Sequence, residues 1–401
     1  MRLPGGRGTL GYCLNVHPTQ TLAEVRAALL GPVRTIKRRL CPDAPFAVGL
    51  RLSAEAAARP EAAAQLAALF RDEGFAAYTM NGFPYGPFHG VPVKEAVYEP
   101  DWTTPERLAY TLDLAAIMAA LVPAWEKTGA EARGAVATIS TVPGGFAPRT
   151  RGREAAVADG LLRAAAGLVR LERETGRRVA LALEPEPFCL LETTADAVAF
   201  FGSHLFTPAA ARRLAALTGL GAGEAADALP RHLGLCLDAC HMAVMFEEPE
   251  ATLAALAAAG IPIHKMQVSA ALRIPRLDAD ARRRAAAFQD GVYLHQTMAR
   301  GTDGAVLPSL DLPQALARGA AADGEEWRIH VHVPLFADPA APLASTADSL
   351  ERLLFLHRNR PFTPHLEVET YTWSVLPREM GGIDVTEGIE KELRWVLQRL
   401  G

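Results

Sequence analysis

Short runs of apolar residues, most of them ended by a polar residue, recur along the chain. Ten of these runs are expected to form strands: 10–17, 46–53, 75–83, 135–142, 179–184, 233–238, 264–269, 292–296, 327–333 and 365–370. Their nearly continuous hydrophobicity is typical of strands buried on both faces. Stretches with helical periodicity follow most of them, at 21–39, 54–73, 105–121, 153–174, 195–201, 249–260, 279–288, 346–358 and 385–400. This alternation predicts an α/β protein with a parallel sheet.

The number of strands points to a particular architecture. Eight parallel strands close a (β/α)8 barrel, so ten candidates indicate a barrel with an insertion before the last strand, at about 271–345. Neither a Pro/Gly-rich linker nor a sharp shift in composition divides the 401 residues. We therefore expect one elaborated barrel domain that spans 1–401.

Composition and charge exclude several classes of protein. Hydrophobic residues make up 50% of the chain and charged residues 21%, which rules out general disorder. The net charge is -4 and no basic run is long, so the chain lacks the basic stripe that nucleic-acid binding needs. No uncharged run of about 20 apolar residues predicts a membrane span. The five dispersed cysteines fit a reducing compartment, and we expect a cytoplasmic protein.

Three carboxylates stand where apolar strands end. Glu184 follows Leu181-Ala182-Leu183, Asp238 ends a second run, and Glu369 ends the last one. The carboxyl ends of barrel strands converge on one mouth, and converging buried acids need a cation or a cage of hydrogen bonds. A divalent metal is the simplest answer. Each acid taken alone could instead cap a helix or pair with an arginine.

Several imidazoles and one amide could complete such a site. His241 follows Asp238 by three residues, so a strand-to-helix turn can direct both side chains to one opening. Gln267 interrupts its strand, either as a neutral oxygen ligand or as a satisfied core amide. The alternating pair His330 and His332 shares one face of a strand, where it could bind metal or belong to the core.

A loop rich in aromatic residues, glycine and proline follows the third strand. It contains Asn81, Phe83, Tyr85 and His89 and suits a shaped cover over a small ligand. We expect these four residues to line a substrate pocket. His17, which ends the first strand, and Trp373, which follows Glu369, are expected to face the same pocket, although Trp373 could equally be a packed aromatic of the barrel rim.

At these residues the chain resembles the xylose isomerase-like TIM barrels, which include sugar isomerases, epimerases and the AP-endonuclease branch. More narrowly, it resembles the EboE family of putative metabolite-traffic proteins. Five segments carry this narrower resemblance: 80–85 (Met-Asn-Gly-Phe-Pro-Tyr), 101–107 (Asp-Trp-Thr-Thr-Pro-Glu-Arg), 183–187 (Leu-Glu-Pro-Glu-Pro), 235–241 (Leu-Cys-Leu-Asp-Ala-Cys-His) and 365–373 (His-Leu-Glu-Val-Glu-Thr-Tyr-Thr-Trp).

The resemblance implies a metal site held by Glu184, Asp238, Gln267 and Glu369. Gln267 stands where the superfamily usually has histidine, which favours Mn²⁺ or Mg²⁺ and leaves Zn²⁺ and Fe²⁺ as alternatives. His295 or His332 is a candidate for the missing imidazole. The further zinc-binding histidines of the endonuclease branch are absent, because the matching positions are Asn81 and Val142. This argues against cleavage of abasic DNA.

We therefore expect a metal-dependent isomerase or epimerase acting on a small hydroxycarbonyl or sugar-like metabolite. The metal would hold adjacent substrate oxygens and stabilise an enediolate, Glu184 and Glu369 would remove and return a proton, and His241 would orient the substrate or a carboxylate. One alternative is a non-catalytic carrier in a metabolite processing or export system. Another is oxidative chemistry at an iron site of His295, His330 and His332. The resemblance also implies a homodimer and pathway partner proteins.

Overall fold

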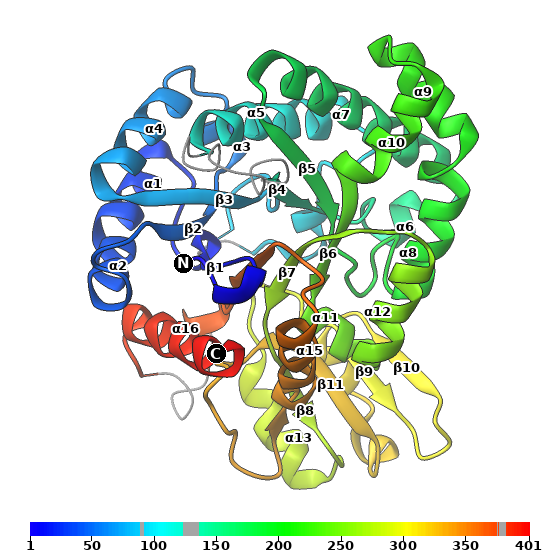
Figure 1. The fold of residues 1–401 in the computed structure, drawn as a ribbon. Helices are drawn as coiled ribbons and strands as arrows, with labels where there is room; N and C mark the ends of the chain where they lie inside the picture. Colours follow the sequence, from blue (N-terminus) through cyan, green and yellow to red (C-terminus); the bar gives the residue numbers. More distant parts are fainter. Residues whose placement is uncertain (89–91, 123–135, 375, 377–381) are drawn as a thin grey trace.

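The chain folds as a closed barrel of eight parallel strands, in the order β1-β13-β7-β6-β5-β4-β3-β2 (Figure 1). The computed structural model describes residues 1–88, 92–122, 136–374, 376 and 382–401. The barrel strands are β1 (Thr9–Cys13), β2 (Phe46–Arg51), β3 (Phe75–Asn81), β4 (Val136–Thr141), β5 (Arg178–Leu183), β6 (Leu233–Asp238), β7 (Ile263–Val268) and β13 (His365–Val368). The predicted (β/α)8 barrel is therefore confirmed.

Helices surround the barrel as an outer ring (Figure 1). They are α1 (Leu22–Ala28), α2 (Arg34–Leu40), α3 (Ala54–Ala57), α4 (Ala62–Glu73), α5 (Pro105–Leu121), α6 (Ala147–Thr150), α7 (Glu154–Thr175), α8 (Thr194–Phe200), α9 (Pro208–Thr218), α10 (Ala222–His232), α11 (Ala239–Val244), α12 (Pro249–Ala258), α15 (Ala347–Asn359) and α16 (Val385–Leu400). The start of α5 shows a local cause, because Thr104 caps the backbone N–H of Arg107 ahead of the first-turn Pro105. Among the helices of the described residues, none is long and apolar enough to cross a membrane.

The insertion that the sequence predicts lies between β7 and β13, and it carries a second sheet. Its strands are antiparallel in the order β10-β9-β11-β8-β12. They are β8 (Ala271–Ile274), β9 (Thr297–Arg300), β10 (Val306–Ser309), β11 (Glu326–His332) and β12 (Ala344–Ser345), accompanied by α13 (Ala279–Ala285) and α14 (Leu312–Leu316). Figure 1 shows most of this sheet and α13 projecting as a lobe on one side of the barrel.

The expected strand at 292–296 is wrong. The carboxylate of Asp290 accepts hydrogen bonds from the backbone N–H groups of Val292 (2.6 Å) and Tyr293 (2.9 Å). A side chain therefore satisfies donors that a neighbouring strand would otherwise bind, and the segment turns. The strand begins only at Thr297.

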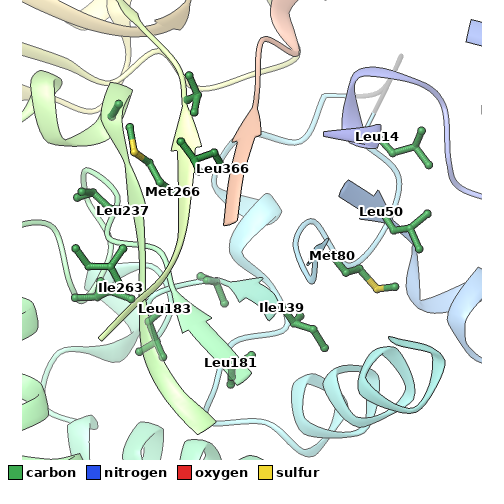
Figure 2. Close-up of a cluster of buried hydrophobic side chains, with 14 of the residues drawn as sticks. Leu14, Leu50, Met80, Ile139, Leu181, Leu183, Leu237, Ile263, Met266 and Leu366 are labelled. Carbon is green, nitrogen blue, oxygen red and sulfur yellow. The ribbon is translucent and has the colours of Figure 1, made fainter. Parts of the chain in front are cut away.

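The barrel strands separate apolar and polar side chains between their two faces. Figure 2 shows buried apolar side chains on strands around the barrel, among them Met80, Met266 and Leu366. Side chains alternate along a strand, so the neighbours Gln267 and Glu367 point to the opposite face, into the barrel. The apolar core thus lies between strands and helices, and the barrel interior carries polar groups toward its mouth.

Candidate metal centre

Three carboxylates meet at the mouth of the barrel. Glu184 follows β5, Asp238 ends β6 and Glu369 follows β13, and an oxygen of each lies within 4.8 Å of the other two. Asp238 and Glu369 are buried and Glu184 is half-buried. The rule that parallel strands present their carboxyl ends on one side accounts for this convergence.

The two oxygens of Asp238 have different surroundings. Oδ1 caps α11 by accepting from the backbone N–H of His241 (3.0 Å) and also accepts from the Ser269 hydroxyl (2.8 Å). Oδ2 is buried and has no hydrogen-bond partner among the described residues. The helix cap considered as an alternative is therefore real, and it leaves the second oxygen available to a ligand.

Two of these carboxyl groups, those of Glu184 and Glu369, have raised pKa values. Burial and the nearby charge of Asp238 raise the pKa of Glu184 to about 7. Burial, together with Glu184 and Asp238, raises the pKa of Glu369 well above its usual value. The Asn15 amide donates to Glu369 Oε1 at 2.6 Å. A cation at this point would relieve the repulsion that otherwise favours protonation.

Imidazoles of α11 and β11 lie beside the carboxylates. His241 and His330 approach with their Nε2 atoms 3.1 Å apart, and the ring centroids of His330 and His332 are 5.5 Å apart. Possible ligand atoms of His332, Asp238 and His241 lie within 4.8 Å of one another. The Nε2 of His332 is buried without a hydrogen-bond partner in the described part of the chain, while Nδ1 bonds the backbone oxygen of Glu369. The alternating pair therefore faces the mouth.

His295 does not join the cluster, which corrects its expected role as a candidate ligand. Its Nδ1 lies 3.0 Å from the backbone oxygen of His330, and its Nε2 lies 2.5 Å from the carboxylate of Asp290. Both ring nitrogens are thus engaged. His295 supports the strand that carries His330, and of the two additional candidates only His332 reaches the carboxylates.

The nitrogen and the oxygen of the Gln267 amide have different surroundings. Its amide nitrogen donates to Asn81 Oδ1 at 3.0 Å, as in a core amide. Its Oε1 is buried and lacks a hydrogen-bond partner among the residues described. That oxygen is the atom that the predicted metal ligand would use.

A buried ion pair lies inside the barrel, and the sequence analysis missed it. Lys265 Nζ is 2.6 Å from Glu367 Oε2, and both side chains are fully buried. The ammonium group also donates to Asn81 Oδ1 (2.8 Å) and to the Ser140 hydroxyl (3.2 Å). Lysine and glutamate within otherwise apolar strands were the signal that could have revealed this pair.

A cavity of about 60 Å³ opens onto the carboxylates and imidazoles. Its lining combines aromatic rings with polar groups: Asn15, Asn81, Phe83, Phe88, Lys94, Tyr98, Glu184, Glu186, Tyr293, His241, Gln296, His330, Glu369 and Tyr371, with a few aliphatic residues. Its one lysine is held by Asp311 at 2.7 Å and by the backbone oxygen of Tyr293 at 2.6 Å. Such a cavity suits a compact, oxygen-rich ligand.

Two of the six residues predicted to form the pocket line this cavity. Asn81 and Phe83 line the cavity. His89 lies outside the described residues. Tyr85, His17 and Trp373 are not among the residues that line this cavity.

Those three side chains have structural contacts instead. Tyr85 packs edge-on against Tyr110, with ring centroids 5.1 Å apart. His17 Nε2 lies 3.1 Å from the hydroxyl of Tyr12. The ring of Trp373 lies against α16, as a packed aromatic of the rim.

Glu186 and its partners were also missed. Possible ligand atoms of Glu186, His241 and His330 lie within 4.8 Å of one another. Tyr98 donates its hydroxyl hydrogen to Glu186 Oε1 at 2.7 Å, and Gln296 Nε2 donates to the Tyr98 oxygen at 2.8 Å. Burial raises the pKa of Glu186. The repeated Glu-Pro at 184–187 placed a second acid two residues after the first and could have indicated it.

No family model and no curated protein matches the chain. Several solved structures are similar to it. A xylose isomerase-like TIM barrel protein from Mycobacterium smegmatis in complex with magnesium is 13% identical, with a TM-score of 0.49, over 98% of this chain and 96% of that one. The IOLI protein with a bound zinc atom is 10% identical, with a TM-score of 0.45, over 98% and 99%. The probable 3-DHS dehydratase AsbF from Bacillus anthracis is 10% identical, with a TM-score of 0.44, over 96% and 97%.

Similarities at this level carry no information about activity. The class of protein follows from the chain's own structure. It is a (β/α)8 barrel with an inserted antiparallel sheet, and the mouth of the barrel holds a buried cluster of carboxylates and imidazoles.

Proposed function

We propose that the chain is a metal-dependent isomerase or epimerase of a small hydroxycarbonyl or sugar-like metabolite. One observation carries this proposal: Glu184, Asp238 and Glu369 converge within 4.8 Å at the mouth of the barrel, next to an aromatic-walled cavity. Catalytic groups in barrels of this architecture lie at this face.

The residues present fit a divalent cation. Asp238 Oδ2 and Gln267 Oε1 are buried oxygens without hydrogen-bond partners within the described ranges, and the three carboxylates supply negative charge. Glu184, Asp238, Gln267 and Glu369 would hold the ion. This all-oxygen set favours Mg²⁺ or Mn²⁺. When bound, the ion would supply Lewis-acid polarisation of substrate oxygens.

The acid and base roles fall to Glu184 and Glu369. Without a bound cation, burial and the neighbouring carboxylates raise both pKa values, that of Glu184 to about 7. A bound cation would lower them again, which leaves these carboxylates ionised and able to accept a proton. One of them takes a proton from the carbon next to the substrate carbonyl and the other returns a proton. His241 carries a hydrogen on Nδ1, which donates to the backbone oxygen of Pro185 (2.9 Å), and this bond sets the ring to orient a carboxylate or the substrate.

The biological setting is part of the proposal. The segments that resemble the EboE family include Asp238, His241 and Glu184, all of which lie at the mouth. On that resemblance we place the activity in a metabolite processing or export system, with pathway partner proteins and a second copy of the chain as candidate partners. The oxidative alternative loses support, because both ring nitrogens of His295 are engaged.

The proposal is tested by proton exchange. Protein loaded with Mn²⁺ or Mg²⁺ is incubated in D₂O with a panel of three- to six-carbon ketoses and aldoses, and loss of C–H signals is followed by NMR. Wild type should exchange the proton next to the carbonyl of its substrate, and Glu184→Gln and Glu369→Gln should abolish exchange while remaining folded. Tight binding of a sugar without exchange would instead support the carrier.

A further inference from the structure

We infer that the buried pair of Lys265 and Glu367 positions a metal ligand: it fixes the amide of Asn81, which in turn fixes the amide of Gln267 with its oxygen available to a cation. This inference rests on the metal site of the proposed function and adds the residues that orient one of its ligands. On the neighbouring strands, Gln267 pairs with Asp238 on one side and with Glu367 on the other. Paired positions of a sheet share one face, which here is the barrel interior.

The orientation of the Asn81 amide follows from its two charged neighbours. Lys265 Nζ, which only donates hydrogen bonds, lies 2.8 Å from one terminal atom of Asn81. Glu367 Oε2, a carboxylate oxygen that only accepts, lies 3.0 Å from the other. The atom beside the ammonium group is therefore Oδ1, and the atom beside the carboxylate is Nδ2. The ion pair permits this orientation and excludes the opposite one.

The orientation of the Gln267 amide follows from that of Asn81. One terminal atom of Gln267 lies 3.0 Å from Asn81 Oδ1. Because an amide oxygen only accepts hydrogen bonds, this atom is Nε2. Gln267 Oε1 is then the atom without a hydrogen-bond partner among the residues that the structure describes, and it is buried.

Without the ion pair, both amides would favour the opposite arrangement. With both turned over, Asn81 Nδ2 would donate to Gln267 Oε1, and a buried acceptor that now lacks a partner would gain one. A buried acceptor without a partner costs free energy, so the observed arrangement needs a cause. The ion pair supplies it, and it keeps Gln267 Oε1 available beside Asp238, whose Oδ2 also lacks a partner within the described ranges.

The other contacts of Asn81 do not decide its orientation. The Ser140 hydroxyl lies 3.0 Å from Oδ1 and the Cys13 thiol lies 2.9 Å from Nδ2, but each of these groups can either donate or accept. Stability alone does not account for the ion pair either. Both charges are fully buried, and their lost hydration offsets their attraction, so apolar residues of similar volume would serve stability as well.

A double-variant cycle of Mn²⁺ binding tests the inference. Chelator-treated full-length protein is titrated with Mn²⁺ by calorimetry. Asn81→Leu removes the acceptor that holds Gln267 and should weaken binding by about 10–100-fold, as loss of a supporting residue does. Gln267→Met removes the ligand oxygen and should weaken binding at least as much. Asn81→Leu added to Gln267→Met should change the affinity by less than about threefold, because Asn81 acts through Gln267.

A second set of variants addresses the ion pair itself. Lys265→Met combined with Glu367→Leu removes both charges, so no unpaired charge remains. Both amides are then able to turn over, and Mn²⁺ binding should weaken by about tenfold or more. Added to Gln267→Met, the same two substitutions should have little effect.

Ser140→Ala is the matched control. It also removes a donor to Asn81 Oδ1 but leaves Lys265 in place, so the Mn²⁺ affinity should stay within about threefold of wild type. Circular dichroism establishes that each variant is folded before titration.

NMR of metal-free protein with ¹⁵N-labelled glutamine gives a readout that needs no metal. The side-chain signal of Gln267 is identified by its absence in Gln267→Met. Its amide protons should exchange with solvent at least about tenfold faster in Asn81→Leu than in wild type, because their acceptor is gone. The amide of Gln296, which donates to the Tyr98 hydroxyl at 2.8 Å, is the internal reference and should not change.

Failure of this inference is distinguishable from failure of the proposed function. Unchanged Mn²⁺ affinity in folded Asn81→Leu, losses that multiply in the Gln267→Met background, or unchanged exchange of the Gln267 amide would overturn the positioning role alone. Wild type that binds no Mn²⁺ would overturn the metal site and this inference with it. Metal binding as expected without exchange of any sugar proton would instead overturn the proposed function and leave the positioning role standing.

Discussion

Replacing Gly49 by alanine should destabilise the protein strongly, although the substitution adds a single methyl group. Gly49 lies on β2 and faces the barrel interior. A Cβ atom built there would fall 1.3 Å from Glu367 Oε1. Its backbone is not in the left-handed region, so the effect is steric rather than conformational. Ordinary contact begins at 3.4 Å, and Glu367 must therefore move by roughly 2 Å.

That movement breaks the buried ion pair. Glu367 is held by Lys265 at 2.6 Å and by the Asn81 amide at 3.0 Å, and both charged side chains are fully buried. Separating a buried pair leaves uncompensated charge and costs about 3–5 kcal/mol. We expect Gly49→Ala to lower the free energy of unfolding by this amount, measured by guanidinium unfolding followed by circular dichroism.

A matched control and a double variant test the cause. Gly223 lies in α10 with no described atom within 4 Å of its added Cβ, so Gly223→Ala should stabilise by about 0.5–1 kcal/mol. Glu367→Ala alone should cost about 3–5 kcal/mol because Lys265 loses its partner. Gly49→Ala combined with Glu367→Ala should cost little more than Glu367→Ala. Strictly additive losses, or a loss below about 1 kcal/mol in Gly49→Ala, would refute the reasoning.

Three further predictions concern ionisable groups. Burial raises the pKa of Glu392 from 4.5 to about 8, so between these pH values the unfolded chain releases a proton that the folded chain keeps. As the pH rises through this range, the free energy of unfolding therefore falls by up to ~1.4 kcal/mol per pH unit. Glu392→Gln should remove this slope in unfolding titrations, and an unchanged slope contradicts the assignment. The pKa of Glu184 near 7 means that protons compete with the metal below pH 7, so Mn²⁺ affinity measured by calorimetry should rise with pH up to about 7 and then level, whereas a flat profile would exclude Glu184 as a ligand. Asp238→Asn keeps a side-chain oxygen that accepts from the backbone N–H of His241, so the free energy of unfolding should change by less than about 1 kcal/mol. The Mn²⁺ affinity should fall by more than ~100-fold, because loss of a residue that only supports a metal ligand already costs up to that factor. Retained affinity would remove Asp238 from the site.

The sequence by itself determined the barrel and the convergence of its acids. Buried parallel strands must be apolar on both faces, so the eight barrel strands stand out as apolar runs. Their common direction then requires that the residues at their carboxyl ends share one mouth. Glu184, Asp238 and Glu369 could therefore be brought together from the sequence before any distance was known.

The inserted sheet was only partly visible in the sequence. Its strands β8, β9 and β10 have four residues each, too few for an alternating pattern to emerge, and Val306 and Leu307 on β10 are exposed. The apolar segment 292–296 has a strand-like composition, yet Asp290 takes its backbone donors. Apolar composition cannot show where a backbone N–H finds its acceptor.

Only the tertiary structure decided which histidines and acids belong to the site. His295 and His330 occupy similar apolar segments, but Asp290 engages the free nitrogen of the first ring, whereas the second faces His241. Glu367 lies two residues before Glu369 and is bound by Lys265 instead of facing the cavity. Hydrophobic periodicity is a local property of the chain and is written in the sequence. The availability of a nitrogen or oxygen atom depends on its partners in space. The partner lies 89 residues away along the chain for His330 and 102 for Glu367, and folding alone brings such partners together.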